Sequence, residues 1–310
     1  MLDLKRLRVL SEVARRGSFS AAANALYLSQ SAVSQQVATL EREVGMPLLE
    51  RTSNGPKLND AGRILVGHAE AALARLEEAE HELKAVAGLE GGEIRIASFP
   101  SASATLLTEG LAEFGDRHPD VLLNVTEAEP EDSLPMLRAA EVDLALVFDY
   151  PTLPRAEERD IDRVLVLSEH MYLALPREHR LAVEDKVRLK DLADETWLCG
   201  VCPSSCGDVV KEACREAGFE PRIGLESDEY QVLQAYVAAG LGFTLLPDLA
   251  LPALRHDLVV RPTTPEAPKR EVWAATRAEG ARSAATLTMV QILREVGARF
   301  AAESPTAVAA

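Results

Sequence analysis

The chain has 310 residues, of which 47% are hydrophobic and 26% are charged, and its formal net charge is −16. This length exceeds that of one ordinary domain, so we expect two or three domains. No apolar run reaches the roughly 18 residues that a membrane-spanning helix needs, and residues 1–6 carry charges in place of an apolar signal region. The sequence therefore predicts a cytoplasmic protein that makes no membrane contact.

The charge is unevenly distributed along the chain. Residues 1–58 contain 8 Lys and Arg against 5 Asp and Glu, whereas the remaining residues contain 25 against 44. A basic N-terminal segment on an acidic protein favours phosphate contact that is confined to one end. The acidic remainder would repel DNA elsewhere, which keeps binding oriented.

The N-terminal segment contains two predicted helices joined by a short turn, between Ser18 and Glu50. A first helix precedes them and ends at Gly17, and Ser18 can cap the next helix. Apolar residues share one side of the last helix, at Val33, Val37, Leu40 and Val44. Small and polar residues share the opposite side, at Ser31, Gln35, Ala38 and Arg42, with Ser34 and Thr39 flanking them. This pattern predicts a helix-turn-helix that binds a DNA groove, and the alternative is a small three-helix domain with a solvated polar face.

The last of these helices and the segment after it supply the predicted DNA contacts. Ser29 is placed to cap the helix, and a glutamine such as Gln30 can bond adenine through two hydrogen bonds. Residues 47–58 predict a short wing, whose basic residues flank a Ser-Asn-Gly-Pro turn and suit backbone phosphates or a minor groove. The predicted DNA-binding residues are Ser29, Gln30, Ser31, Ser34, Gln35, Arg51, Ser53, Asn54 and Lys57.

Asn59 and Asp60 open a long predicted helix that runs to about Gly88. Apolar residues follow two heptad rows, Leu65, Ala72, Ala79 and Val86 in one and Ala69, Leu76 and Leu83 in the other. A helix of roughly 29 residues is a rod about 44 Å long, which has no core of its own to bury this stripe. We therefore expect two copies of the chain to pair along it, and packing on the rest of the chain is the alternative.

Beyond Gly91 and Gly92, which mark a hinge, predicted strands and helices alternate in the manner of a parallel α/β sheet. The first unit has strands at Ile94–Ala97, Val121–Glu127 and Asp143–Phe148, and helices near Ala104–Arg117 and Leu134–Ala140, with Pro135 in the first turn of the latter. The second unit has strands at Met171–Leu175, Trp197–Cys199, Arg222–Glu226 and Phe243–Leu246. The strand Glu271–Thr276 and the helix Arg282–Phe300 are expected to return to the first unit, and residues 301–310 to form a disordered tail.

Residues 1–88 resemble the LysR-type transcriptional regulators of bacteria, through GSFSAAANALYLSQSAVSQQVATLEREVGMPLLER and then KLNDAGRIL. The resemblance implies a multidomain fold: an all-α winged helix-turn-helix domain at 1–58, a linker helix at 59–90, and a two-lobed α/β effector domain like those of periplasmic binding proteins. Lobe I is expected at 91–162 and 268–300, and lobe II at 163–267. The partners implied are double-stranded operator DNA, a small-molecule effector, RNA polymerase, and further copies of the chain in a homodimer or homotetramer.

The sequence departs from the usual pattern of the family in the helix that would read DNA. Ser31 stands where the family usually has proline, and Gln35 stands where it often has arginine. Neither departure affects the expected fold, but both leave the DNA sequence preference open.

Two serine-rich loops follow predicted strands and lead into helices, at 98–103 and 203–206. Hydroxyls and backbone N–H groups at such positions suit a carboxylate or another small anion. The resemblance places the effector cleft between these loops, and the alternative is that the serines only cap helices. The candidate effector-binding residues are Ser98, Phe99, Ser101, Ser103, Phe148, Ser204, Ser205, Cys206, Glu226 and Phe243.

Four cysteines occur within sixteen residues, at Cys199, Cys202, Cys206 and Cys214. Their spacing does not match a zinc ribbon, so no metal ligand set is predicted. Cys214 has the position of a buried structural thiol. The dipole of a helix N-terminus would stabilise the thiolate of Cys206, and Cys202 lies near enough to act as a resolving thiol. A thiol- or metal-responsive cluster is therefore a hypothesis, beside the alternative that the cysteines are incidental.

No catalytic motif is present. The histidines are scattered, and neither HExxH, GxSxG nor a GxxxxGK[ST] phosphate loop occurs, so we predict neither an enzyme nor a cofactor. The remaining competitor is a small-molecule binding or thiol- or metal-sensing protein whose N-terminal domain contacts another protein. The salt dependence of DNA binding separates this competitor from a DNA-binding regulator, because phosphate contacts release counterions and weaken as salt rises.

Overall fold

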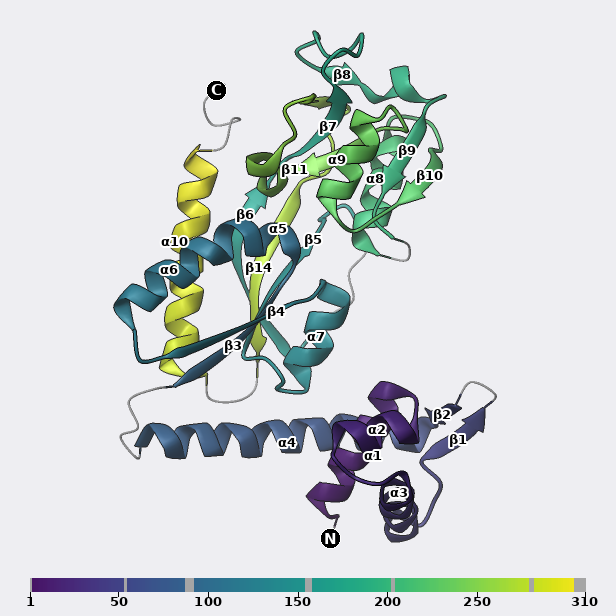
Figure 1. Ribbon diagram of the computed structural model, residues 1–310, viewed down its shortest axis with the longest axis vertical. Coiled ribbons are helices and arrows are strands. Elements are labelled where there is room, and N and C mark those ends of the chain that lie inside the picture. Colours follow the sequence, from purple (N-terminus) through teal and green to yellow (C-terminus); the bar gives the residue numbers. More distant parts are fainter. Residues whose placement is uncertain are drawn as a thin grey trace. The chain divides into compact units, whose positions relative to one another are not determined.

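A computed structural model describes residues 2–52, 55–86, 92–153, 158–201, 204–278 and 282–303. It divides into two compact units, one of residues 1–89 with 138–141 and one of residues 90–137 with 142–310. Each unit is described by itself below (Figure 1).

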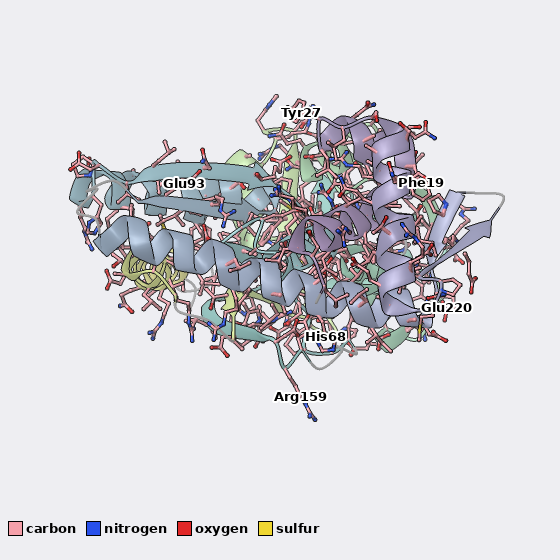
Figure 2. All side chains as sticks on the ribbon, turned by 90° about the horizontal axis from the view of Figure 1, so that it is seen from below. Phe19, Tyr27, His68, Glu93, Arg159 and Glu220 are labelled. Carbon is pink, nitrogen blue, oxygen red and sulfur yellow. The ribbon has the colours of Figure 1, made fainter. Side chains whose placement is uncertain are left out.

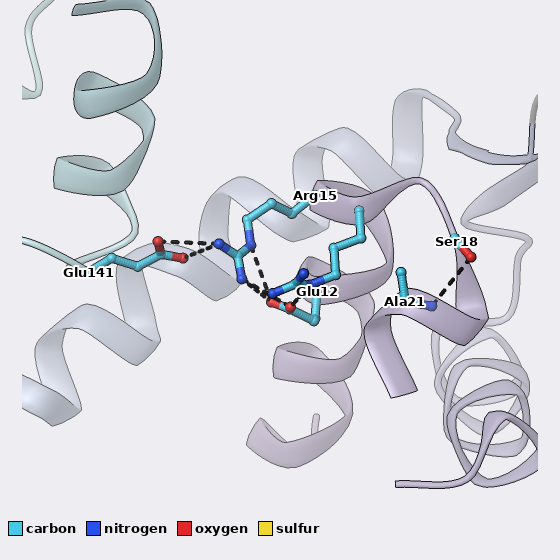
Figure 3. A network of polar contacts seen from close by, with 6 residues as sticks. Glu12, Arg15, Ser18, Ala21 and Glu141 are labelled. Carbon is cyan, nitrogen blue, oxygen red and sulfur yellow. Dashed lines mark hydrogen bonds and ion pairs between the residues drawn. The ribbon is translucent and has the colours of Figure 1, made fainter. Parts of the chain in front are cut away.

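The N-terminal unit begins with three short helices, α1 (Leu4–Arg16), α2 (Phe19–Ala25) and α3 (Gln30–Val44). Gly17 ends α1 in the left-handed conformation, with φ of 59°, which glycine adopts without steric cost. The Ser18 hydroxyl accepts a hydrogen bond from the backbone N–H of Ala21 at 3.4 Å (Figure 3), and Ser29 accepts one from Ala32 at 3.2 Å. The predicted helix ends and caps are therefore confirmed.

The predicted apolar side of α3 faces the core of this unit. Val33, Val37 and Leu40 are buried, and Val44 packs against the same cluster. Leu10 and Val13 of α1, neither of them exposed, complete the centre of this core. The α3 backbone is thus fixed by burial on one side, which leaves the polar side free to contact a partner.

A two-stranded antiparallel hairpin follows α3, as the predicted wing requires, with β1 at Leu49–Thr52 and β2 at Gly55–Leu58. The oxygen Oε1 of Glu41 accepts hydrogen bonds from the backbone of Leu48 and Leu49 at 2.9 and 3.4 Å, so a helix side chain fixes the base of the wing. A Cβ at Gly55 would lie 2.5 Å from the Gly17 carbonyl oxygen, and its φ is 106°. Both facts require glycine at that corner.

Helix α4 spans Asp60–Val86 without interruption, so the predicted linker helix is confirmed over 27 residues, or about 40 Å. Asn59 caps it by accepting a hydrogen bond from the N–H of Gly62 at 2.9 Å. Val66 and Ala69 are buried in the core of the N-terminal unit, whereas Leu76 is 46% exposed. The first turns of α4 therefore belong to that core, and Leu76 of the predicted apolar stripe lies at the surface.

The first lobe of the second unit is built on a five-stranded sheet with strand order β4-β3-β5-β14-β6. The strands are β3 (Glu93–Ser98), β4 (Leu122–Glu127), β5 (Leu144–Asp149), β6 (Ile161–Glu169) and β14 (Arg270–Arg277). β3 pairs in parallel with β4 and β5, but β14 is antiparallel to both of its neighbours. The sheet is mixed rather than parallel as expected, because the chain returns from the second lobe in the opposite direction.

Helices cover both faces of this sheet (Figure 1). One face packs against α6 (Thr108–Arg117) and α10 (Ala284–Glu303), and the other against α7. α7 spans Pro130–Arg138, so it starts four residues before the expected helix at Leu134–Ala140, and Pro135 lies inside it rather than in its first turn. α10 extends to Glu303, so the expected tail from 301 begins too early, and residues 304–310 lie outside the description.

The second lobe contains three small sheets, with strand orders β11-β7-β12, β10-β9 and β13-β8. Their strands are β7 (Met171–Pro176), β8 (Val187–Arg188), β9 (Thr196–Cys199), β10 (Arg222–Glu226), β11 (Thr244–Pro247), β12 (Leu258–Arg261) and β13 (Thr263–Thr264). The helices are α8 (Ser205–Glu216) and α9 (Tyr230–Ala238). The expected start of lobe II at 163 is wrong, because residues 163–169 form part of β6 and pair with β14 in the first sheet.

Candidate functional site

The polar side of α3 is a solvent-facing surface. Its centre is formed by Ser31, Gln35, Ala38 and Arg42, all exposed, and Ser34 is exposed beside them. Hydrogen bonds order the start of the helix: Ser20 donates to the amide oxygen of Gln30 at 2.9 Å, and the hydroxyls of Ser29 and Ser31 lie 3.0 Å apart. Ser29 also caps the helix, so its hydroxyl oxygen is already engaged by the backbone.

Arg42 closes the C-terminal end of this surface. Its guanidinium donates to the Thr39 hydroxyl at 2.7 Å and to the Ala38 carbonyl at 3.3 Å. These contacts hold the charge against the helix, on the same side as Gln35. A helix face with amide, hydroxyl and guanidinium donors suits both base edges and phosphates.

Tyr27 is a surface residue that the sequence patterns did not single out. It lies in the turn between α2 and α3, is 97% exposed, and has a positive φ of 54° (Figure 2). An exposed aromatic ring with a terminal hydroxyl, directly before the N-terminus of α3, can donate to a phosphate. Its signal in the sequence is a lone aromatic residue in a turn where no apolar periodicity requires one.

The wing presents Lys57 as an exposed side chain on β2. Arg51 lies on β1 opposite Pro56, but its side chain is outside the part of the structure described. Ser53 and Asn54, expected at the tip, also lie outside the described residues.

Ion pairs occupy part of the positive charge of the N-terminal unit. Glu12 pairs with both Arg15 and Arg16 (Figure 3), and Arg6 pairs with Glu43. These three arginines lie on α1, and the two carboxylates offset part of their charge. The basic side chains that remain available to attract phosphate therefore include those on α3 and on the wing.

The second unit contains a cavity of about 220 Å³. Its walls come from the loop before α7, the first turn of α7, the end of β5 and the N-terminus of α8. The lining residues are Glu129, Glu131, Asp132, Phe148, Val201, Ser204, Ser205, Cys206 and Asp228. Four of these are carboxylic acids, and none of the lining residues described is a lysine or an arginine, so the cavity is electrostatically negative.

Four of the candidate effector-binding residues line this cavity: Phe148, Ser204, Ser205 and Cys206. The Ser204 hydroxyl also caps α8, because it accepts a hydrogen bond from the backbone N–H of Gly207 at 3.2 Å. Ser204 therefore has the capping role that was the alternative to ligand binding, in addition to its place in the cavity wall. The carboxylates are not among the predicted residues, because the prediction rests on the hydroxyls and backbone N–H groups of the loops at 98–103 and 203–206. The rule that ligands bind beyond the carboxyl ends of strands also selects the loops after β4 and β10, which carry Glu129 and Asp228.

The other six candidates lie outside the cavity wall. Ser98 is buried and donates to the Phe99 carbonyl at 3.3 Å, and the Ser103 hydroxyl donates to the Ser98 carbonyl at 3.5 Å. Glu226 is exposed at the end of β10, and Phe243 is buried against the ring of His179. The first serine-rich loop therefore bonds mainly to its own backbone, and Ser101 and Phe99 contact Arg270 instead.

Arg270 is a fully buried cation that the sequence patterns did not identify. Its Nε donates to Oε1 of Glu169 at 2.6 Å, its Nη2 to the Ser101 hydroxyl at 3.1 Å, and its Nη1 to the Tyr230 hydroxyl at 3.4 Å. The guanidinium carbon lies 5.0 Å from the ring centroid of Phe148. Burial alone would lower the pKa of Arg270, but Glu169 raises it overall, so the guanidinium stays charged. This cation connects residues of both lobes.

Glu129 is the most strongly perturbed carboxylate in the cavity. Burial raises its pKa to about 7, and the negative charges of Asp228 and Glu131 add to the effect. Asp228 accepts a hydrogen bond from the backbone N–H of Val201 at 2.8 Å, which fixes it beside the N-terminal loop of α8. A carboxylate poised at this pKa changes its charge near neutral pH.

Three of the four cysteines lie within the described residues, so the hypothesis of a Cys202–Cys206 thiol pair remains a prediction. Cys214 is buried, as expected, and Cys199 is buried at the end of β9. Burial raises the pKa of the Cys206 thiol to about 12 and outweighs the opposing effect of the Arg270 charge. Cys202 lies outside the described residues. Within the ranges described, no three His, Cys, Asp or Glu side chains are grouped so that they could hold a metal ion.

No helix among the residues searched is long and apolar enough to cross a membrane.

Two family models match the chain. One, described as "LysR substrate binding domain", covers residues 87–298, and the other, "Bacterial regulatory helix-turn-helix protein, lysR family", covers residues 4–63. The chain is 30% identical over 296 residues to the uncharacterized HTH-type transcriptional regulator YfeR of Shigella flexneri, covering 95% of this chain and 94% of that protein. It is 34% identical over 248 residues to the HTH-type transcriptional regulator CfxR of Cupriavidus necator, covering 79% of this chain and 75% of that protein.

Solved structures share the fold over almost the whole chain. Full-length OxyR C199D from Pseudomonas aeruginosa matches with a TM-score of 0.69 and 22% identity, covering 95% of each chain. Full-length CbnR complexed with its target DNA matches with a TM-score of 0.60 and 24% identity, covering 95% of this chain and 100% of that chain. At these identities the likeness establishes the architecture alone.

Proposed function

This chain belongs to the LysR family of transcriptional regulators, and we propose that it reads operator DNA with the polar side of α3 while its two-lobed domain senses a small molecule. One observation supports this DNA-contacting surface: α3 exposes a row formed by Ser31, Gln35 and Arg42, while its other side is buried. The N-terminus of α3, capped by Ser29, enters the major groove, and the wing with Lys57 contacts the adjacent backbone.

Two copies of the chain pair along α4. Leu76 belongs to the predicted heptad rows and is 46% exposed, so its side chain is available to the α4 helix of a second copy. A dimer with two-fold symmetry presents two α3 helices to the half-sites of a partly symmetric operator. The names of related structures describe a regulator bound to its target DNA, which agrees with this arrangement.

The effector occupies the cavity between Phe148, Ser204 and the carboxylates, and shifts the angle between the lobes. That shift alters the spacing of the DNA-binding domains in the dimer, and through it the access of RNA polymerase. A ligand can drive this change only to the extent that it binds one lobe arrangement more tightly than the other. Walls drawn from both lobes provide such a difference.

The test is operator binding by the full-length protein as a function of salt. DNA from upstream of the regulator's own gene, labelled with a fluorophore, is titrated at several salt concentrations and anisotropy is measured. A plot of log affinity against log salt falls steeply for a protein that displaces several counterions. Absence of binding, or an affinity that does not depend on salt, would contradict DNA reading by this unit.

A further inference from the structure

The effector cavity concentrates negative charge from two separate parts of the domain. Glu129, Glu131 and Asp132 come from the loop after β4 and the first turn of α7, whereas Asp228 comes from the loop after β10 in the second lobe. Asp228 is the strongest of the charges that act on Glu129. The buried cation Arg270 acts on Glu129 in the opposite direction, but it is paired with Glu169 and does not line the cavity, so the carboxylates outnumber it there. The cavity therefore repels a small anion, which is the type of ligand expected from the serines in its wall.

A small recess of about 10 Å³ adjoins this cavity and shares Cys206 and Asp228 with its walls. Thr244 also lines the recess, is only 1% exposed, and its Oγ1 has no hydrogen-bond partner among the residues described. Buried hydroxyls are almost always hydrogen-bonded. The unpartnered oxygen therefore leaves one hydrogen bond available to a water or a ligand group that enters this recess.

The chemistry of the walls specifies that group. Ionised carboxylates accept hydrogen bonds and do not donate, and the hydroxyls of Ser205 and Thr244 can also accept. A metal ion does not fit, because no three metal-ligating side chains converge in the described ranges. A protonated amine supplies three donors and a positive charge in one compact group.

We propose that the effector of this regulator is a small organic cation whose protonated amine binds between Glu129 of the first lobe and Asp228 of the second. The proposal rests on the sensing role proposed above and names the class of ligand for that cavity. A cation between the two carboxylates removes the repulsion between the lobes and attracts each of them, so binding favours the closed arrangement. Either a free diamine or the side-chain amine of an amino acid provides this group.

The experiment is calorimetric titration of the full-length protein with four-carbon ligands that differ in charge: 1,4-diaminobutane, 1,4-butanediol and succinate. Ornithine, titrated in parallel, separates an amino acid from a simple diamine. We expect heat of binding from at least one of the two amines and none from butanediol or succinate. Binding of succinate, or no binding of either amine at millimolar concentration, would overturn the cationic class.

Isosteric variants test the position of the amine. Glu129→Gln and Asp228→Asn each remove one charge with little change of shape, and we expect each to weaken amine binding by about tenfold or more. Glu226→Gln is the matched control, because this carboxylate is exposed near the same loop but does not line the cavity. Equal weakening by all three variants would show only general attraction to an acidic protein and would overturn the assignment.

Operator binding by the same preparations keeps the two proposals distinguishable. A protein that binds its operator but no amine remains a DNA-reading regulator with a different effector. A protein that binds an amine in the cavity but no DNA contradicts the proposed function and leaves the ligand class standing.

Discussion

Arg270 and Glu169 form an ion pair in the interior of the effector domain, with 2.6 Å between Nε and Oε1, and both side chains are at most 1% exposed. Glu169 also accepts a hydrogen bond from the backbone N–H of Leu249 at 2.8 Å. Two charges are therefore desolvated together and each is satisfied by several partners. Removing one leaves the other buried without its counter-charge.

Replacing Arg270 with methionine is expected to destabilise the effector domain by about 3–5 kcal/mol, the usual effect of breaking a buried ion pair. Both tryptophans, Trp197 and Trp273, lie in this domain, so their fluorescence during urea unfolding reports on it alone. Arg255→Met is the control, because its pair with Asp257 is at the surface and contributes little to stability. An equal effect of both variants would contradict a special role for the buried pair.

Replacing Gln35 with alanine is expected to reduce discrimination between operator and random DNA by about 1–3 kcal/mol. The loss should be concentrated at one base-pair position, because Gln35 lies at the centre of the exposed face. Gln36→Ala changes the same residue type one step around α3, where the side chain is half-buried, and should leave discrimination intact. If Gln35→Ala does not alter the preference, the reading face has been placed wrongly.

Replacing Arg51 with alanine should weaken binding to all DNA sequences about equally, since a phosphate contact carries no base information. The slope of log affinity against log salt should also decrease by about one. Competition assays with operator and random DNA measure both quantities. A sequence-dependent loss would instead indicate that the wing reads bases.

Replacing Leu76 with lysine is expected to weaken self-association, because the charge would be buried in the paired α4 helices. Analytical ultracentrifugation measures the change, and operator affinity should fall with it. Leu287→Lys is the control, since Leu287 is 50% exposed on α10, outside the proposed interface. A dimer that persists in Leu76→Lys would place the interface elsewhere.

Amine binding should become tighter as pH rises through about 7. Burial raises the pKa of Glu129 to about 7, with Asp228, Glu131 and Glu229 acting in the same direction and Arg270 against them. Glu129 is mostly neutral near pH 6 and mostly ionised near pH 8, so affinity should increase about tenfold over that range. Glu129→Gln should flatten the profile, whereas an unchanged profile would exclude Glu129 as the titrating group.

The raised pKa of Glu129 has the opposite pH dependence in its effect on folding stability: without ligand, rising pH lowers the stability of the protein. The folded state holds the Glu129 proton up to about pH 7, whereas an ordinary glutamate releases it near 4.5. Stability from this group is therefore fully present below pH 4.5 and declines as pH rises towards 7. Denaturation across this range in the absence of ligand measures the decline, which Glu129→Gln should abolish.

The thiol of Cys206 should react slowly with alkylating reagents. A pKa of about 12 instead of 9.0 lowers the thiolate fraction roughly a thousandfold at neutral pH. Mass spectrometry after timed exposure to iodoacetamide measures the modification at Cys206. Rapid labelling, together with loss of operator binding after oxidation that the Cys206→Ser variant lacks, would support the thiol-sensing hypothesis instead.

The helical N-terminal unit could be predicted closely because its signals are local. Gly17, Ser18 and Ser29 define helix ends through their own backbone and side-chain chemistry, and the period of Val33, Val37 and Leu40 identifies the buried side of α3. These features need only neighbouring residues, so the sequence contains them directly.

The cavity of the second unit was predicted only in part because its chemistry depends on distant residues. Nothing near Arg270 in the chain indicates that Glu169 and Ser101, 101 and 169 positions away, satisfy its guanidinium. The pKa of Glu129 likewise depends on burial and on Asp228 in another lobe. Strand β6 was missed for a related reason, because its pairing with β14 joins segments about a hundred residues apart.

Glu169 and Arg270 are also opposite one another in the ladder between β6 and β14, at the end where both strands leave the first sheet. The chain crosses to the second lobe directly after Glu169 and returns directly before Arg270. The ion pair thus holds the two crossing segments together at the point where both leave the first sheet. A movement that separates the two crossing segments would therefore have to break a buried ion pair, which disfavours such a movement.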